Sequence, residues 1–215
     1  QAAMSLFVSF EGPEGCGKTT QIRLLAEWLP SLGYDVLATR EPGGTRIGDQ
    51  IRQILLNPAH TEMCAAAEIL LFSAARAQIV HQVILPHLQG GGIVLCDRFA
   101  DSTFAYQGYG QGLDLAALRQ ITQFATGGLM PDVTFYLDIP AAEGLKRKAG
   151  GDSAEWNRME RKQLEYHRRV RDGYLELARR NPERWIILDA GEGVAILQEC
   201  IRAEIRSRLG LAETS

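Results

Sequence analysis

Short apolar runs alternate with longer amphipathic segments along this chain. Five of these runs are rich in β-branched or aromatic residues, or are bounded by Gly, Pro or Asp, and predict strands over Leu6–Phe10, Val36–Thr39, Ile93–Cys96, Val133–Leu137 and Trp185–Leu188. Apolar residues at helical spacing predict helices over Thr19–Leu32, Thr61–Gln89, Trp156–Arg180 and Val194–Leu209. Strands that alternate with helices predict βαβ units, and therefore a parallel sheet covered by helices on both faces.

The predicted helix Thr61–Gln89 carries signals at both ends. Thr61 belongs to the residue types that cap helix N-termini, and Pro86 should kink or shorten the last turn because proline lacks an N–H. No apolar run approaches the length of a membrane span, and no repeat or linker divides the chain. We therefore expect a single domain over residues 4–213, with residues 1–3 as a cloning remnant.

Composition and charge exclude several kinds of partner. A net charge of −3 over 215 residues gives no overall attraction to nucleic acid or to an anionic membrane. Residues 146–184 carry 12 Lys/Arg against 7 Asp/Glu, which indicates either a solvated helical face or contact with a polyanionic ligand. The four cysteines form no CxxC pair and accompany no histidine cluster. This pattern argues against structural zinc or disulfides and for a reducing, cytoplasmic location.

A phosphate-binding loop lies between the first predicted strand and the first predicted helix. The segment reads GxxxxGK[ST], and together with the residue after it we expect it to bind ATP through Gly12, Pro13, Glu14, Gly15, Cys16, Gly17, Lys18, Thr19 and Thr20. Glycines let backbone N–H groups converge on an anion, and the helix N-terminus adds positive partial charge. Lys18 can reach the β- and γ-phosphates, and the Thr19 hydroxyl can ligate Mg²⁺.

Cys16 has two possible interpretations. It lies beside Lys18 at a helix N-terminus, and both features lower the pKa of a thiol. The interpretation that we favour is a small residue tolerated at a variable loop position.

A second polar segment follows the predicted strand Ile93–Cys96. Asp97 and Arg98 should emerge at the C-terminal edge of the sheet, where a carboxylate can hold the water shell of a metal and an arginine can fork onto a phosphate. The alternative for this pair is a surface ion pair. Further along, side chains suited to binding a pyrimidine base or its sugar are Ser102, Thr103, Tyr106 and Gln107.

These motifs together favour a small kinase. A GTPase would need an N-K-x-D segment, which does not occur, and motor ATPases are usually larger. The predicted fold is α/β of the P-loop NTPase type, with three α/β/α layers, a five-stranded parallel sheet and a helical lid.

The whole set of motifs resembles that of the thymidylate kinase family. The matching segments lie between about Phe7 and Leu188, and they are Arg40–Thr45 (REPGGT), Glu68–Arg76, Asp97–Gln107 (DRFADSTFAYQ), Gly144–Arg147 and Tyr174–Leu177. The resemblance implies ATP-dependent phosphorylation of dTMP to dTDP, for dTTP synthesis, with Mg²⁺ as cofactor and a homodimer as the assembly. The alternatives are another nucleoside or nucleotide kinase, and a P-loop ATPase or binding module without transfer.

The resemblance also implies a role for each site residue. The thymine would stack on Phe72 and meet Arg76, Thr103 and Gln107, while Tyr106 would crowd the sugar 2′ position. Arg98 and Arg52 would clamp the monophosphate, and Glu14 would contact the 3′-hydroxyl. Glu41 would lie near the metal and the acceptor phosphate, whereas Glu11 could support either group.

A lid over residues 146–158 is implied as well. Some family members carry an arginine directly after the P-loop acid, where this chain has Gly15. The bacterial type instead supplies positive charge from its lid, here from Lys146, Arg147, Lys148 and Arg158. We expect Arg158 to reach the transition state and Arg147 to lie nearer the adenine. No general base is required, because a phosphate monoester with a second pKa of about 6 is already mostly a dianion at neutral pH.

Overall fold

The structure is a computed structural model that describes residues 5–150 and 156–211. Five parallel strands form one sheet in the order β2-β3-β1-β4-β5, and they are β1 Leu6–Glu11, β2 Val36–Arg40, β3 Ile93–Asp97, β4 Val133–Asp138 and β5 Trp185–Asp189. The predicted fold class and all five predicted strands are confirmed. Every strand runs one residue further than predicted, to a charged residue at the C-terminal edge of the sheet. That edge therefore carries ionisable groups in a row.

The helices lie between these strands, except for α9, which follows the last one. Their bounds are α1 Lys18–Ser31, α2 Arg46–Leu56, α3 Ala65–Ile79, α4 Leu85–Gln89, α5 Ala100–Thr103, α6 Leu115–Thr126, α7 Ala141–Ala149, α8 Leu164–Arg180 and α9 Val194–Arg208. Two π-helical segments, η1 Val80–Ile84 and η2 Phe104–Gly110, continue α3 and α5 without a break.

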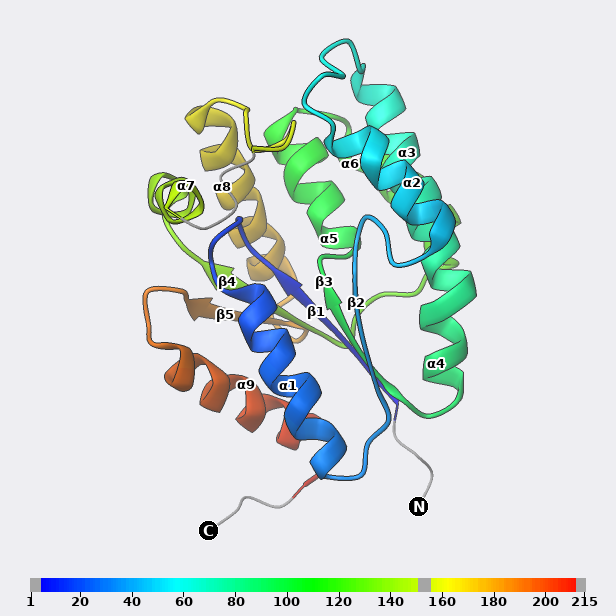
Figure 1. Ribbon diagram of the computed structural model, residues 1–215, viewed down its shortest axis with the longest axis vertical. Helices are drawn as coiled ribbons and strands as arrows, with labels where there is room; N and C mark the ends of the chain where they lie inside the picture. Colours follow the sequence, from blue (N-terminus) through cyan, green and yellow to red (C-terminus); the bar gives the residue numbers. More distant parts are fainter. Residues whose placement is uncertain (1–4, 151–155, 212–215) are drawn as a thin grey trace.

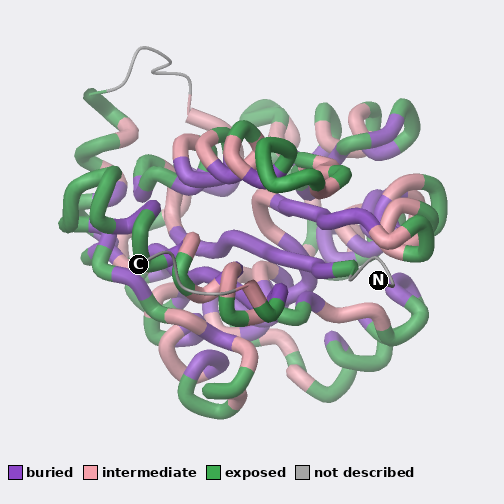
Figure 2. The backbone as a smooth tube through the Cα atoms, turned by 90° about the horizontal axis from the view of Figure 1, so that it is seen from below, coloured by how far each residue is buried: buried purple, intermediate pink, exposed green. Residues whose placement is uncertain are grey.

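Three layers result (Figure 1). Helices α1 and α9 cover one face of the sheet, where Val8 and Phe10 of β1 pack against Leu25 and Ile201. On the other face Phe7 packs with Ile79 of α3, and the α5–α8 part of the chain covers β4 and β5. The central strands are buried between helices that expose their outer sides (Figure 2). Burial of both faces explains why β1 reads as an almost unbroken apolar run.

The long helical segment predicted over Thr61–Gln89 is helical from Ala65. Its N-cap is Cys64, which makes no side-chain capping hydrogen bond, so the prediction of a Thr61 cap is wrong. The π-helical segment η1 comes directly before Pro86, in the first turn of α4. Because proline cannot donate to the carbonyl four residues earlier, a widened turn at this point accommodates it and the chain stays helical.

Residues Ala65–Gln89 are also more apolar than we expected from the sequence. Their most apolar 18-residue window has a mean hydropathy of 1.4, enough by length and composition alone to cross a membrane. In this fold, however, the segment packs between α2 and α6 and buries Ile79 and Ile84 against the sheet. It is a core helix.

The predicted helix Trp156–Arg180 begins eight residues late, at Leu164, with Gln163 as its N-cap. Residues 156–163 form turns that return to α2, where the Arg158 N–H donates to the Leu56 carbonyl at 3.1 Å. The amphipathic spacing in these residues therefore reflects contacts with neighbouring elements and not a helix.

Candidate active site

A cavity of about 490 Å³ opens at the C-terminal edge of the sheet. It is lined by the P-loop, the ends of β2 and β3, and helices α3, α5 and α8. The predicted site residues that line it are Pro13, Glu14, Thr19, Glu41, Arg52, Phe72, Arg76, Asp97, Arg98, Ser102, Thr103, Tyr106 and Gln107. Segments far apart in the sequence thus meet in one place.

The P-loop has the backbone geometry that its glycines allow. Gly12 has φ +139, and a Cβ there would lie 2.7 Å from the Leu137 carbonyl oxygen. Gly17, at φ +101, is the N-cap of α1. Both positions require glycine, the first for space and conformation and the second for conformation. Thr20 lies half-buried in the first turn of α1.

The P-loop folds around the Lys18 ammonium. Its Nζ donates to the carbonyl oxygens of Gly12 and Pro13, each at 3.1 Å, and the side chain is buried. A positive charge is therefore fixed under the loop whose N–H groups would receive phosphates.

Cys16 lies in the same loop but is 2% exposed. Burial raises the pKa of its thiol, against the weaker opposing influence of Lys18. The predicted lowering of this pKa is therefore wrong, because burial outweighs the nearby charge. A buried Cys16 that packs inside the loop agrees with the interpretation that we favour, a small residue tolerated at this position.

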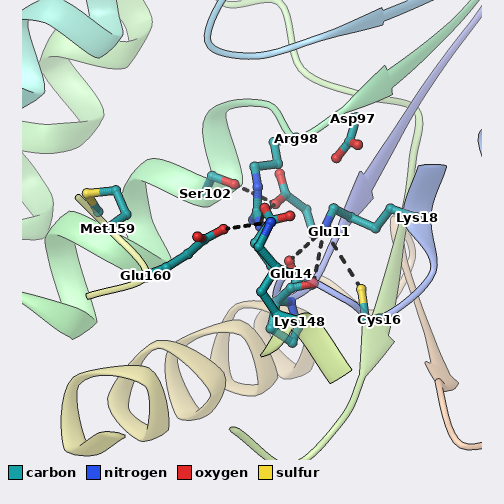
Figure 3. A network of polar contacts seen from close by, with 12 residues as sticks. Glu11, Glu14, Cys16, Lys18, Asp97, Arg98, Ser102, Lys148, Met159 and Glu160 are labelled. Atoms are coloured by element: carbon teal, nitrogen blue, oxygen red, sulfur yellow. Dashed lines mark hydrogen bonds and ion pairs between the residues drawn. The ribbon is translucent and has the colours of Figure 1, made fainter. Parts of the chain in front are cut away.

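Arg98 joins the P-loop to the sheet edge (Figure 3). Its Nη2 lies 2.9 Å from Glu14 Oε1, and its guanidinium lies 5.1 Å from the centre of the Tyr106 ring. Lys18 is the main cause of a lowered pKa for Glu14, and Arg98 adds to it, so this carboxylate stays charged. Arg98 itself has φ 68, an uncommon backbone conformation for a residue with a side chain.

Glu11 holds this strained turn in place. It is fully buried, and its carboxylate accepts hydrogen bonds from the Phe99 N–H at 2.9 Å, Ser102 Oγ at 2.6 Å and Tyr174 Oη at 2.7 Å. Arg98 Nη1 lies 3.9 Å from the same carboxylate. Burial raises the pKa of Glu11, and Arg98 opposes the shift. Glu11 therefore holds Phe99 and Ser102, which follow Arg98 in the chain, together with Tyr174 of α8.

Thr19 and Asp97 form the pair that could hold a divalent cation. The Thr19 hydroxyl lies 3.4 Å from Asp97 Oδ2, and both residues line the cavity. A hydroxyl and a carboxylate beside a phosphate-binding loop fit Mg²⁺, which prefers oxygen ligands and completes its shell with phosphates and water.

The far end of the cavity is built around Arg76. This buried guanidinium donates from Nε to Glu41 Oε2 at 2.7 Å, from Nη1 to Thr103 Oγ1 at 2.9 Å and from Nη2 to the Phe99 carbonyl at 3.3 Å. Burial raises the pKa of Glu41 to about 7, although Arg76 opposes the shift. Phe72 lies one helical turn before Arg76 and lines the same cavity.

Comparison with known proteins agrees with this geometry. The family model for thymidylate kinase matches residues 10–201. The thymidylate kinase of Roseiflexus sp. (strain RS-1) is 60% identical over 216 residues, covering 96% of each chain. That of Herpetosiphon aurantiacus is 47% identical, covering 98% of this chain and 99% of the relative. A crystal structure of thymidylate kinase from Ehrlichia chaffeensis aligns with a TM-score of 0.77 at 33% identity, over 94% of this chain and 99% of that one.

This chain belongs to the thymidylate kinase family. The activity of a thymidylate kinase, phosphorylation of dTMP to dTDP, is therefore the activity of this chain. The two alternatives left open by the sequence, another nucleotide kinase and an ATPase without transfer, are set aside.

The basic residues Lys146, Arg147, Lys148 and Arg158, predicted to supply a lid, do not line the cavity. Arg147 bonds to Glu143 and to the Ala190 carbonyl, and its Cβ lies 3.2 Å from the position that a Cβ on Gly15 would occupy. Lys148 Nζ lies 3.7 Å from Glu160 Oε1. The lid tip, residues 151–155, lies outside the described residues.

Arg158 does not take the position that we predicted for it. Its Nη2 lies 2.5 Å from Glu68 Oε2 and its Nε donates to the Leu55 carbonyl at 2.9 Å, so it faces α2 and α3 and does not line the cavity. A role for Arg158 in phosphoryl transfer would require this buried pair to break. That role stays a prediction.

Three important side chains escaped the sequence analysis as site residues. Tyr174 and Glu68 served only to bound matching segments, and Glu160 was not singled out. Glu68 did leave a signal, because it is a lone acid in the apolar run Ala65–Phe72. In the structure it is 2% exposed and bonded to three side chains. A buried carboxylate in an apolar helix needs such partners.

Proposed function

We propose that this thymidylate kinase binds ATP on the P-loop and dTMP in the adjoining cavity, with Arg98 as the group that meets the phosphates of both. The observation that carries this proposal is the position of Arg98, 2.9 Å from the P-loop acid Glu14 while lining the cavity. A guanidinium has five N–H donors, so Arg98 can keep Glu14 and still fork onto a phosphate.

Catalysis in this arrangement consists of alignment and charge neutralisation. The acceptor phosphate is already mostly a dianion at neutral pH, so no side chain has to remove a proton. Lys18, Arg98 and Arg52 offset the repulsion between the donor and acceptor phosphates and the charge that develops on the transferred group. Arg52 is held for this role by a 2.9 Å bond from Nη1 to the Pro42 carbonyl.

Thr19 and Asp97 would hold Mg²⁺, directly or through its water shell. When bound, the ion supplies further positive charge to the phosphates and orients them. The separation of 3.4 Å between the two side chains supports this assignment, since both can address one ion bound between them and the P-loop.

The base would lie between Phe72 and the polar end of the cavity. Phe72 offers a ring for stacking, and Arg76 offers the N–H groups that Glu41, Thr103 and Phe99 leave unused. Tyr106 would lie against the sugar, where its ring excludes a 2′-hydroxyl, and Glu14 would accept from the 3′-hydroxyl. Ser102, held by Glu11 and Tyr174, would support the turn that carries these groups.

We assign the chain to the type that carries glycine after the P-loop acid. Helix α7 packs directly on Gly15, where a Cβ would lie 3.2 Å from the Gly144 carbonyl oxygen, so a larger residue there would displace the helix. Lys148 is then the lid cation whose charge contributes to the lowered pKa of Glu14 in the P-loop. We propose one domain over residues 4–213, with a lid over 146–158.

A homodimer is the assembly that the exposed apolar side chains favour. Phe124 of α6 is 90% exposed and Leu70 of α3 is 59% exposed, and Ile47 and Ile54 of α2 add to the same group of adjoining helices. Exposed apolar groups gathered on neighbouring helices indicate an interface. We place the enzyme in the cytoplasm, since four free cysteines suit a reducing compartment.

The proposal is tested with a coupled assay of purified protein, Mg²⁺-ATP and a panel of dTMP, UMP, GMP and thymidine. Turnover should be highest with dTMP and should require Mg²⁺. Equal turnover of all three monophosphates, or full activity after chelation of divalent ions, would contradict it.

A further inference from the structure

Glu68 lies behind the base end of the cavity, on α3, one helical turn before Phe72. Its Oε1 accepts from Gln107 Nε2 at 2.9 Å and from Gln111 Nε2 at 2.5 Å, and its Oε2 lies 2.5 Å from Arg158 Nη2. The carboxylate does not line the cavity itself. It connects the segment 156–163, where Arg158 lies, with η2, which carries Gln107.

These partners determine which way the Gln107 amide points. A carboxylate paired with an arginine only accepts hydrogen bonds, so the amide group that faces Glu68 must be the NH₂. Gln107 is 2% exposed and lines the cavity, and its side-chain oxygen Oε1 has no protein partner among the described residues. The end that remains for a ligand is therefore the carbonyl oxygen, an acceptor.

From this geometry we infer that Glu68 is a positioning residue that selects the nucleobase by fixing the Gln107 amide with its carbonyl toward the cavity. An acceptor at this place fits the N3–H of thymine or uracil. Cytosine presents an acceptor at N3, so two lone pairs would face each other and its binding would leave Gln107 unsatisfied. The inference rests on the proposed contact between Gln107 and the base.

The substitution Glu68→Gln tests the inference because it keeps the shape and changes only the hydrogen-bonding pattern. Arg158 only donates, so the new amide would turn its oxygen to Arg158 and its NH₂ to Gln107. Gln107 would then reverse and present NH₂ to the cavity. We expect the ratio of kcat/KM for dTMP to that for dCMP to fall at least about tenfold, with kcat/KM for dCMP rising in absolute terms.

Two controls separate this effect from a loss of structure. The ratio of dTMP to dUMP should stay within about twofold in Glu68→Gln, since both bases carry N3–H. Gln111→Ala removes the other bond to the same oxygen from a residue that does not line the cavity. It should leave the ratio of dTMP to dCMP unchanged.

A structural role alone would lower kcat/KM for dTMP and dCMP equally, and an unchanged ratio in Glu68→Gln would overturn the inference. If that variant does not fold, Glu68→Leu combined with Arg158→Met replaces the buried pair by apolar side chains of similar size. It releases Gln107, so the ratio should again fall, and an unchanged ratio would overturn the inference.

Gln107→Ala distinguishes a failure of the inference from a failure of the proposed base contact. A lower dTMP to dCMP ratio in Gln107→Ala, with no change in the two Glu68 variants, would overturn the role of Glu68 alone. An unchanged ratio and an unchanged KM for dTMP in Gln107→Ala would overturn the base contact and the inference together.

Discussion

Replacement of Glu11 by alanine is the perturbation whose outcome the structure specifies most closely. The variant removes one fully buried carboxylate that accepts from the Phe99 N–H, Ser102 Oγ and Tyr174 Oη. The Phe99 N–H would lose its acceptor, at a cost of about 1–3 kcal/mol for a buried donor. Ser102 Oγ and Tyr174 Oη lie 3.0 Å apart and can bond to each other, so only one hydroxyl loses a partner, for about 1 kcal/mol more.

The free energy of unfolding should therefore fall by about 2–4 kcal/mol in Glu11→Ala. Urea denaturation followed by circular dichroism at pH 7.5 measures it. The kinetic effect should be concentrated on the acceptor side, because Glu11 fixes the backbone directly after Arg98. We expect kcat/KM for dTMP to fall by at least about tenfold, while KM for ATP changes by less than about threefold.

Glu11→Gln is the matched control. Its carbonyl can still accept from Phe99, and the Ser102 and Tyr174 hydroxyls can turn to accept from its NH₂. It should lose less than half of the stability that Glu11→Ala loses. An alanine variant within about 0.5 kcal/mol of wild type, or a glutamine variant as unstable as alanine, would refute the reasoning.

Two further outcomes are expected. Burial raises the pKa of Glu41 to about 7, from a value near 4.5 in the unfolded chain. Between pH 4.5 and pH 7 Glu41 is therefore protonated in the folded chain and ionised in the unfolded chain. The stability that Glu41 contributes decreases as the pH rises through this range. Relative to Glu41→Gln, wild type should therefore lose up to about 3 kcal/mol of unfolding free energy from pH 4.5 to pH 7.5 in urea titrations, and a gain would show that Arg76 dominates instead. Phe124→Glu should convert the proposed dimer to monomer in light scattering with little change in thermal stability, because this side chain is 90% exposed, and an unchanged mass would remove α6 from the proposed interface.

Much of the fold was predictable because its signals are local. Strands buried on both faces read as apolar runs, and the P-loop glycines are required by backbone geometry at Gly12 and Gly17. Helices α2, α5, α6 and α7 were not predicted. Helix α5 is only four residues long, and α7 begins after Pro140 and runs at its C-terminal end into the basic stretch that we assigned to the lid. Short helices of this kind are stabilised by tertiary contacts more than by their own pattern.

The candidate site was predictable as a set of residues and not as a set of contacts. Asp97, Arg98 and Gln107 were identified because they follow a strand in a matching segment. The contacts depend on which elements pack together. They include the bonds by which Glu11 anchors the turn, and the pairing of Arg158 with Glu68 in place of a position facing the phosphates. Glu11 lies 88 residues from its partner Phe99, and Glu68 lies 39 from Gln107. No local pattern encodes pairings at such separations.

The most direct test of the account is the rate of dTDP formation by Arg98→Ala. We predict that kcat/KM for dTMP falls by about 10²–10³-fold while KM for ATP stays within about threefold of wild type, since Lys18 and the P-loop backbone remain. Turnover of dTMP within about threefold of wild type would contradict the claim that this arginine at the sheet edge joins the two phosphates.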